Sequence, residues 1–371
     1  MRVVHVSLVR PRGRPEPEAL LAAWPTLHDI AAAVRCAGAE VSVVQSFHQV
    51  AELKLDGVHY RFAPEPALPG RPTGVSPWAV AAAVKAFRPD IIHVNGLEFG
   101  WHTRVLCGLG APVLVQDHAS RAEGGGLRRR WGLRNISAVA FTDARQAEPF
   151  LAKAHLRRGL PVFSVPESST RFAPGDQAAA RQACGLDGDP AVLWVGRLTS
   201  NKDPLTVLGA IELAAQDLPG LRFWCCHQED DLLPQVRARI AASPILAERV
   251  RLLGRVTHRE VETLCRAADL FMLASHAEGS GYALMEALAC GATPLVSDIP
   301  SFRRLTGDGR VGALAPVENI EAFARALVRL AQAPRAEARR RTIEHFERDL
   351  SFDAVGAQLV QAYRDVIARA R

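Results

Sequence analysis

The order of apolar and polar positions along this 371-residue chain predicts an alternation of buried strands and amphipathic helices. In the first half, short apolar runs alternate with stretches whose apolar residues recur at helical spacing. This alternation is typical of a parallel sheet with right-handed helical crossovers, in which ligands bind at the carboxyl ends of the strands. Strands are predicted at residues 3–9, 40–45, 91–94, 113–116, 138–142 and 162–165, and helices at 18–37 and 77–87.

A segment rich in turn-forming residues, 166–176, interrupts this pattern, and a second series of strands and helices follows it. We therefore predict two doubly wound domains, residues 1–167 and 168–351, that face a central cleft. Clefts between domains favour ligand sites. The last helical pattern, residues 352–371, is expected to pack back on the first domain. Strands of the second domain are predicted at residues 191–195, 221–226, 250–253, 270–274 and 293–296.

The composition fits two globular domains, each with a core of its own. Hydrophobic residues make up 48% of the chain and charged residues 23%. The seven cysteines form no CxxC pair and no Cys/His metal spacing, so we expect reduced thiols in a cytoplasmic protein. The apolar run at 3–9 is too short for a signal peptide and is predicted to be a strand. No run of about 18 apolar residues is present, so no membrane-spanning helix is expected.

The formal net charge of +6 is compatible with anionic partners. Arginine clusters occur at residues 128–130 and 339–341, but aromatic residues do not alternate with them as they do in proteins that bind single strands. We therefore expect no nucleic-acid partner. The clusters are either solvated helix faces or contacts with an acceptor or a membrane. The second alternative would place the protein peripherally at the inner membrane face.

Two carboxylates, Glu278 and Glu286, mark the strongest candidate site. Glu278 lies in a loop interrupted by Gly279 and Gly281, and Glu286 lies inside the helix that follows. Glycines let the backbone approach a ligand closely, and the free N–H groups of a helix N-terminus attract an anion. The pattern predicts a site for a phosphorylated sugar, with one carboxylate accepting hydrogen bonds from the sugar and the other from a ribose.

A second glycine turn follows the strand predicted at 191–195. Gly196 permits the turn, and Arg197 and Lys202 bring two cations to the carboxyl end of the strand. An arginine fork and a lysine point charge can together neutralise a diphosphate leaving group. Considered alone, this segment is more typical of a solvated basic loop. Because both loops follow strands of the same predicted sheet, a shared phosphate site is favoured.

Residues 192–327 resemble the retaining GT-B glycosyltransferases of the large family 4 group. The resemblance rests on Gly196-Arg197 with Lys202, on the E-x7-E pair Glu278 and Glu286, and on the segment 291–294. It implies an α/β GT-B fold with two Rossmann-like domains. It also implies transfer of a sugar, with retention and front-face attack, from a nucleoside-diphosphate sugar to an acceptor hydroxyl. No cofactor and no metal are expected, and the donor is expected to be a UDP- or GDP-sugar.

The resemblance also assigns roles to residues. Arg197 and Lys202 would hold the diphosphate, Glu278 the hydroxyls of the transferred sugar, and Glu286 the ribose hydroxyls. His118 resembles a histidine of the family that hydrogen bonds to the donor sugar. Further donor contacts are expected from Gly196, Arg255, Val256, Gly279, Ser280, Gly281 and Tyr282.

The acceptor side departs from the family pattern. Relatives have a glycine pair after the first strand, whereas here only Gly13 stands in that loop, and an aromatic residue common after Glu-Gly is replaced by Ser280. Asn95 and Glu98 follow the strand predicted at 91–94 and are further acceptor-side candidates, although Asn95 could equally serve the Asn-Gly turn. The acceptor, whether glycan, lipid or small molecule, stays open.

Two alternatives to transfer remain at this point. Nucleotide-sugar epimerases and sugar phosphorylases share the two-domain architecture, although the spacing of Glu278 and Glu286 favours a transferase. A non-catalytic protein that binds nucleotide sugars is the third interpretation, since the first loop is altered. Product analysis with and without an acceptor separates the three.

Overall fold

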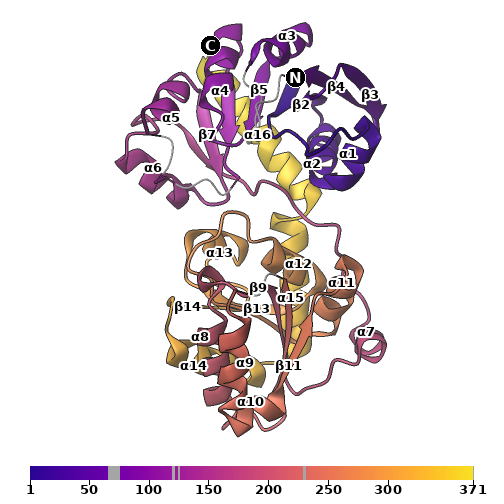
Figure 1. Cartoon of the computed structure of the whole chain (residues 1–371), viewed down its shortest axis with the longest axis vertical. Coiled ribbons are helices and arrows are strands. Elements are labelled where there is room, and N and C mark those ends of the chain that lie inside the picture. Colours follow the sequence, from indigo (N-terminus) through magenta and orange to yellow (C-terminus); the bar gives the residue numbers. More distant parts are fainter. Residues whose placement is uncertain (66–75, 119–121, 124–125, 229–230, 371) are drawn as a thin grey trace. The chain divides into compact units, whose positions relative to one another are not determined.

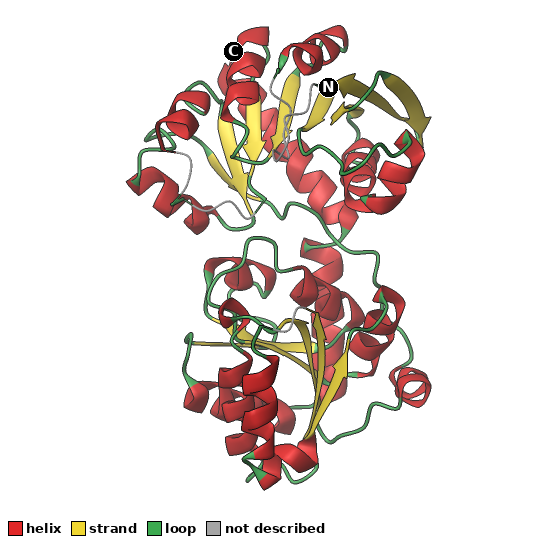
Figure 2. Cartoon of the chain, in the orientation of Figure 1, coloured by secondary structure: helices red, strands yellow, loops and turns green. Residues whose placement is uncertain are grey.

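The computed structural model describes residues 1–65, 76–118, 122–123, 126–228 and 231–370. The chain forms two compact units (Figure 1). One consists of Met1–Ser169 together with Phe352–Arg371, and the other of Thr170–Ser351. The division thus falls two residues beyond the boundary predicted at 167. Each unit is a Rossmann-like α/β domain with a mainly parallel sheet between layers of helices, which confirms the predicted fold class (Figure 2).

Among the residues described, the first unit contains an eight-stranded sheet with the order β3-β4-β2-β1-β5-β6-β7-β8. All neighbours pair in parallel except β3 and β4, which are antiparallel. The strands are β1 (Arg2–Ser7), β2 (Glu40–Phe47), β3 (Ala51–Leu55), β4 (Val58–Pro64), β5 (Ile91–Asn95), β6 (Val113–Gln116), β7 (Ala138–Phe141) and β8 (Val162–Ser164).

Both faces of this sheet are buried. Val3 and Val4 follow one another in β1 and enter two different hydrophobic cores, because successive side chains of a strand point to opposite faces. Helices cover both faces, which explains the near-continuous apolar runs of the central strands. The helices are α1 (Pro17–Ala23), α2 (Pro25–Cys36), α3 (Trp78–Ala86), α4 (Gly100–Leu106), α5 (Gly126–Gly132), α6 (Glu148–Ala152) and α16 (Phe352–Ala370).

The single helix predicted at residues 18–37 is wrong, because the structure divides this stretch into α1 and α2. Trp24 separates the two helices with φ −125° and ψ 65°. Pro25 has no N–H to donate into the helix, and its ring excludes the helical conformation of the preceding residue. The break follows from the proline.

A hairpin of β3 and β4 was not predicted. Asp56 and Gly57 form its turn with φ of 48° and 76°, and Leu55 pairs with Val58. An Asp-Gly pair between alternating residues is a strong local hairpin signal, because both central positions of the favoured turn need a positive φ. The sequence therefore contained this signal.

The C-terminal helix α16 belongs to the first unit, where it packs against α2 (Figure 1). Gly356 lies against the α2 backbone, since a Cβ added there would be 2.5 Å from the carbonyl oxygen of Ala33. The buried hydroxyl of Tyr363 lies 3.0 Å from His5 Nε2 and 2.5 Å from His93 Nδ1. Burial lowers the pKa of His5 to about 4, so that ring is neutral at physiological pH.

The second unit has a parallel sheet with the order β11-β10-β9-β12-β13-β14. Its strands are β9 (Ala191–Arg197), β10 (Arg222–Gln228), β11 (Val250–Gly254), β12 (Leu270–Leu273), β13 (Thr293–Ser297) and β14 (Ala313–Ala315), and only β14 was not predicted. Its helices are α7 (Gln177–Cys184), α8 (Pro204–Ala214), α9 (Leu233–Ala241), α10 (Pro244–Arg249), α11 (His258–Ala267), α12 (Tyr282–Cys290), α13 (Pro300–Leu305), α14 (Ile320–Gln332) and α15 (Arg335–Asp349).

Candidate functional site

The predicted donor residues gather at the carboxyl edge of the second unit's sheet. The strands of this sheet are parallel, so their carboxyl ends meet at the same edge. Gly196 and Arg197 end β9, and residues 255–256 follow β11. Residues 278–282 lie between β12 and α12 or begin that helix. The arrangement brings three separate segments of the chain to one side of the unit.

Lys202 and Glu278 form an ion pair at this edge. Their side chains are only 14% and 13% exposed. The two residues are 76 positions apart, and both were predicted to contact the donor. Removing either partner would leave a charge that is largely shielded from water, which is unfavourable unless a ligand takes its place. Arg197 is exposed at the same strand end.

Hydrogen bonds join the two loops that carry this ion pair. The N–H of His276 donates to the carbonyl oxygen of Asn201 at 2.8 Å. The Asn201 side-chain amide donates to the carbonyl oxygen of Ala277 at 3.0 Å. These contacts fix one loop against the other and so hold Lys202 beside Glu278. Sequence analysis did not identify Asn201 or His276.

Asp203 adds a further connection. Its φ is 44°, and its carboxylate accepts hydrogen bonds from the N–H and hydroxyl of Thr206 at 3.1 and 2.7 Å. Asp203 thereby caps the N-terminus of α8. A carboxylate oxygen also lies 3.1 Å from Nε2 of His276. An Asp before Pro204 was a recognisable helix-start signal, whereas its contact with His276 has no local signature.

The turn into α12 requires glycine at position 281. Gly281 is the N-cap residue with φ 66°, a conformation that side chains with a Cβ rarely adopt. A Cβ there would also lie 2.8 Å from Cδ1 of Leu305. Gly279 and Ser280 are half-buried in the preceding loop, and Tyr282 is 37% exposed. The N–H groups of the first turn of α12, which have no carbonyl partner within the helix, therefore lie at the same edge as the ion pair.

Glu286 lies in the second turn of α12, with its side chain 15% exposed. Nε2 of His258, the first residue of α11, is 2.8 Å from a carboxylate oxygen of Glu286. Burial raises the pKa of Glu286 above its ordinary value, while the hydrogen bond and charge of His258 oppose that shift. The His258 ring packs against Phe172 with the ring centres 4.5 Å apart. His258 and Phe172 were not predicted.

In the first unit, the structure brings two predicted residues together and adds a third. Nε2 of His118 is 3.1 Å from the side-chain oxygen of Asn95, and Nδ1 forms an ion pair with Glu167. Only a protonated imidazole donates from both nitrogens, so this geometry suits the imidazolium form. Desolvation opposes protonation, but the hydrogen bond and charge of Glu167, with smaller contributions from Asp117 and Glu98, raise the pKa of His118.

Glu167 was not predicted, because it lies among the turn-forming residues of the linker and no local pattern marks it. Its side chain is only 6% exposed, and it is 49 positions from His118. Gly13 lies in an exposed bend with φ 75°, and a Cβ added there would meet no described atom within 4 Å. The positive φ favours glycine at position 13, whereas no close contact with another part of the unit requires it.

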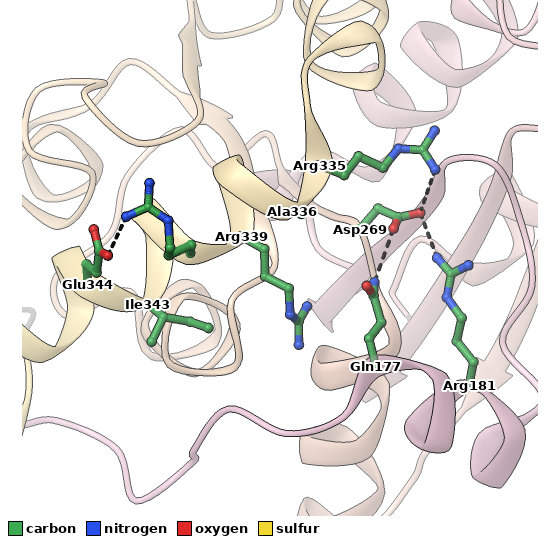
Figure 3. Close-up of a pocket in the computed structure, with 9 residues that line it drawn as sticks. Gln177, Arg181, Asp269, Arg335, Ala336, Arg339, Ile343 and Glu344 are labelled. Carbon is green, nitrogen blue, oxygen red and sulfur yellow. Dashed lines mark hydrogen bonds and ion pairs between the residues drawn. The ribbon is translucent and has the colours of Figure 1, made fainter.

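Across the described ranges, no group of three or more His, Cys, Asp and Glu residues is arranged to hold a metal ion. A pocket of about 620 Å³ lies instead at the opposite, amino edge of the second unit's sheet (Figure 3). Asp269, which precedes β12, accepts hydrogen bonds there from Arg181 at 2.7 Å and from the N–H of Ala191 at 2.8 Å. Arg339 donates to the carbonyl oxygen of Arg266 at 3.0 Å. These charges are occupied in holding strands and helices together.

The second unit matches a known family. Residues 176–348 match the model of the family "Glycosyl transferases group 1". The chain is also 32% identical, over 203 residues, to D-inositol 3-phosphate glycosyltransferase of Mycobacterium tuberculosis. That match covers 53% of this chain and 42% of the relative. The chain thus matches less than half the length of this relative.

Two solved structures share the fold over nearly the whole chain. Sucrose-phosphate synthase from Thermosynechococcus elongatus has a TM-score of 0.67 and 19% identity, and the match covers 99% of both chains. HepE of Anabaena, in complex with UDP and glucose, has a TM-score of 0.67 and 15% identity. This match covers 98% of the present chain and 100% of HepE. Both likenesses concern the fold.

Proposed function

Because residues 176–348 match the model of the group 1 glycosyltransferases, we propose that the protein is a glycosyltransferase. In this proposal it moves a sugar from a nucleoside-diphosphate sugar to an acceptor hydroxyl, with retention at the anomeric carbon and without a metal ion. The observation that carries the proposal is the ion pair of Lys202 and Glu278, held at the carboxyl edge by two hydrogen-bonded loops.

To bind a nucleotide sugar, a protein must place cationic groups and hydrogen-bond acceptors only a few atoms apart. Its diphosphate is anionic, whereas the neighbouring sugar offers hydroxyl donors. In this proposal Lys202 contacts the diphosphate and Glu278 accepts hydrogen bonds from the sugar, which the adjacency of the two side chains in the ion pair supports. Glu286, further along α12, would accept hydrogen bonds from the ribose in place of His258. The ion pair of the ligand-free protein thus keeps both groups in position.

In the proposed step, the bond between the anomeric carbon and the diphosphate oxygen breaks. The acceptor oxygen bonds to the same face of that carbon, and its proton passes to the departing oxygen. Arg197, Lys202 and the first N–H groups of α12 stabilise the negative charge that develops on the diphosphate. Fixed cations of this kind supply the stabilisation that a metal ion would otherwise provide.

Incubation with UDP- and GDP-sugars and a panel of acceptors tests the proposal. UDP-glucose is the first donor to try because the HepE structure contains UDP and glucose. Inositol phosphates belong in the acceptor panel because of the name of the mycobacterial relative. We expect acceptor-dependent release of nucleoside diphosphate that survives EDTA, and a product whose anomeric configuration by NMR equals that of the donor.

Variants make the test specific to the site. Glu278→Gln should abolish transfer, whereas Arg340→Gln should leave it unchanged, because Arg340 pairs only with Glu344 on the exposed face of α15 among the contacts described. Isomerisation of the sugar without acceptor would indicate an epimerase instead. Phosphate-dependent cleavage would indicate a phosphorylase, and donor binding with no turnover in any acceptor would indicate a binding protein.

A further inference from the structure

Three exposed tryptophans lie together on the first unit. Trp78 of α3 is 62% exposed, Trp101 of α4 is 44% exposed and Trp131 of α5 is 46% exposed. The rings of Trp78 and Trp101 meet edge to face with centres 6.2 Å apart, and those of Trp101 and Trp131 stack at 5.5 Å. Leu127, one turn before Trp131, is 82% exposed. Clustered aromatic surface of this kind usually marks an interaction site.

The stacking depends on a close crossing of α4 and α5. A Cβ added to Gly132 would lie only 2.2 Å from Cα of Gly100, so the two helices touch backbone to backbone. Trp101 follows Gly100 and Trp131 precedes Gly132 in the sequence, so the glycine contact brings the two rings together. The cluster is therefore held by the packing of the helices, and its exposure does not result from a loosely placed side chain.

The charged residues of the three helices that carry the tryptophans have one sign. The segments that form α3, α4 and α5 contain no Asp or Glu, and they carry Lys85, Arg104, Arg128, Arg129 and Arg130. Arg104 lies over the ring of Trp131 with its guanidinium carbon 5.6 Å from the ring centre. Arg129 is buried, whereas Arg128 and Arg130 are exposed beside Leu127 and Trp131.

Carboxylates near these helices in the sequence are engaged elsewhere. Glu98 precedes α4 and contributes to the electrostatic environment of His118. Glu123 precedes α5 and pairs with Lys153 at 3.5 Å. The face formed by Trp78, Trp101, Leu127 and Trp131 with Arg128 and Arg130, the tryptophan–arginine face, therefore combines apolar and cationic groups without an acidic residue of its own helices.

We propose that the tryptophan–arginine face binds the surface of an anionic phospholipid bilayer. Tryptophan favours the boundary between headgroups and acyl chains, because its ring is apolar and its N–H is polar. Arginines beside it are attracted to anionic headgroups. Durable peripheral binding generally needs two such contributions, and this face supplies both. No helix in the described ranges is long and apolar enough to cross a membrane, so the attachment proposed here is peripheral.

The charge pattern favours a bilayer over a protein partner. A bilayer rich in anionic lipid offers a uniform negative surface, which a face of only cations and apolar groups complements. A second copy of this chain would instead bring the same arginines against each other and repel, as like charges do at interfaces. The proposal concerns binding and does not depend on the transferase activity.

Co-sedimentation of the full chain with vesicles tests the proposal. We expect binding to phosphatidylcholine vesicles that contain phosphatidylglycerol, weaker binding to phosphatidylcholine alone, and a decrease as salt is raised. Arg128→Gln with Arg130→Gln should reduce partition about 25-fold, at about fivefold for each arginine. The matched control, Arg340→Gln with Arg341→Gln on α15 of the second unit, removes the same charge and should bind like the wild type.

The tryptophans are tested separately. Trp78→Ser is expected to weaken binding without loss of fold, because this side chain is the most exposed of the three, and circular dichroism verifies the fold. Brominated lipids should quench tryptophan fluorescence of the wild type more strongly than that of Trp78→Ser. Equal binding to charged and neutral vesicles, no binding to either, or binding of the arginine variant at wild-type strength would each overturn the proposal. A concentration-dependent dimer that replaces vesicle binding and disappears in Trp78→Ser would assign the face to self-association instead.

Discussion

Both edges of the second unit's sheet carry an ion pair between a carboxylate and a cationic side chain, but the two pairs join different kinds of segment. At the amino edge, Asp269 accepts from Arg181 and from the N–H of Ala191, and it ties α7 to the start of β9 (Figure 3). At the carboxyl edge, Lys202 ends a short 3-10 turn, Glu278 lies in a loop, and the two side chains pair with each other. Both edges bury their ion pairs. The difference is that the partners of Asp269 belong to α7 and β9, whereas Lys202 and Glu278 lie in segments that connect strands to helices.

This difference explains why the arginine-lined pocket at the amino edge is a weaker candidate for a ligand site than the ion pair of Lys202 and Glu278. Arg181 donates to the carbonyl oxygen of Ala267 at 3.0 Å, and Arg339 donates to that of Arg266, so both arginines satisfy the last carbonyl groups of α11. Cations at a helix C-terminus also interact favourably with its dipole. The amino edge therefore contributes to stability, and the carboxyl edge stays the candidate for the proposed chemistry.

The largest expected effect is on stability at the amino edge. Asp269→Ala should lower the free energy of unfolding by about 3–5 kcal/mol, because it leaves Arg181 without its buried partner. Urea unfolding followed by circular dichroism measures this loss. Glu344→Gln is the control, since Glu344 lines the same pocket but is exposed. A loss no greater than that of the control would contradict the structural role of Asp269.

The next effect concerns activity at the carboxyl edge. Lys202→Met should reduce kcat/KM about 10²- to 10³-fold, or about 2.7–4 kcal/mol, because a fixed charge at the leaving group is lost. Lys202→Met combined with Glu278→Gln removes the uncompensated carboxylate as well. If the pair served only stability, this double variant would regain activity. We expect it to regain stability in urea but to remain inactive in the transfer assay.

Sequence reasoning predicted the architecture well where the chain repeats one signal. Short apolar runs such as those of β9 and β12 stand out because strands buried on both faces need little alternation. Local exceptions were missed, namely the break at Pro25 and the hairpin at Asp56-Gly57, although each has a recognisable sequence signal. Neither the helix break nor the hairpin follows from the alternation of apolar runs and helical stretches on which the prediction was based.

The site was only partly predictable, for a physical reason. Residues that follow parallel strands share an edge, so Lys202 and Glu278 could be expected near each other. The contacts that fix them could not, because the bond from Asn201 to Ala277 spans 76 positions and depends on the path of two loops. The same holds for Glu167 and His118. The functional roles of all these residues stay predictions until the variants are measured.

The smallest expected effect is a pH dependence at Glu286. Because burial raises its pKa in the folded protein, Glu286 contributes stability that is fully present below the pKa of the unfolded chain and is lost as pH rises through the folded pKa. Between about pH 4 and pH 7, Glu286→Gln should therefore become progressively more stable relative to the wild type. Thermal unfolding of the ligand-free proteins across this range measures the difference. His258→Ala, which removes the opposing hydrogen bond, should enlarge it. If the stabilities of the wild type and Glu286→Gln change in parallel with pH, ionisation of Glu286 does not destabilise the fold, and ribose binding is not needed to explain a carboxylate at this position. If the two stabilities diverge, the wild type carries a destabilising charge at the position where the proposed donor requires a hydrogen-bond acceptor.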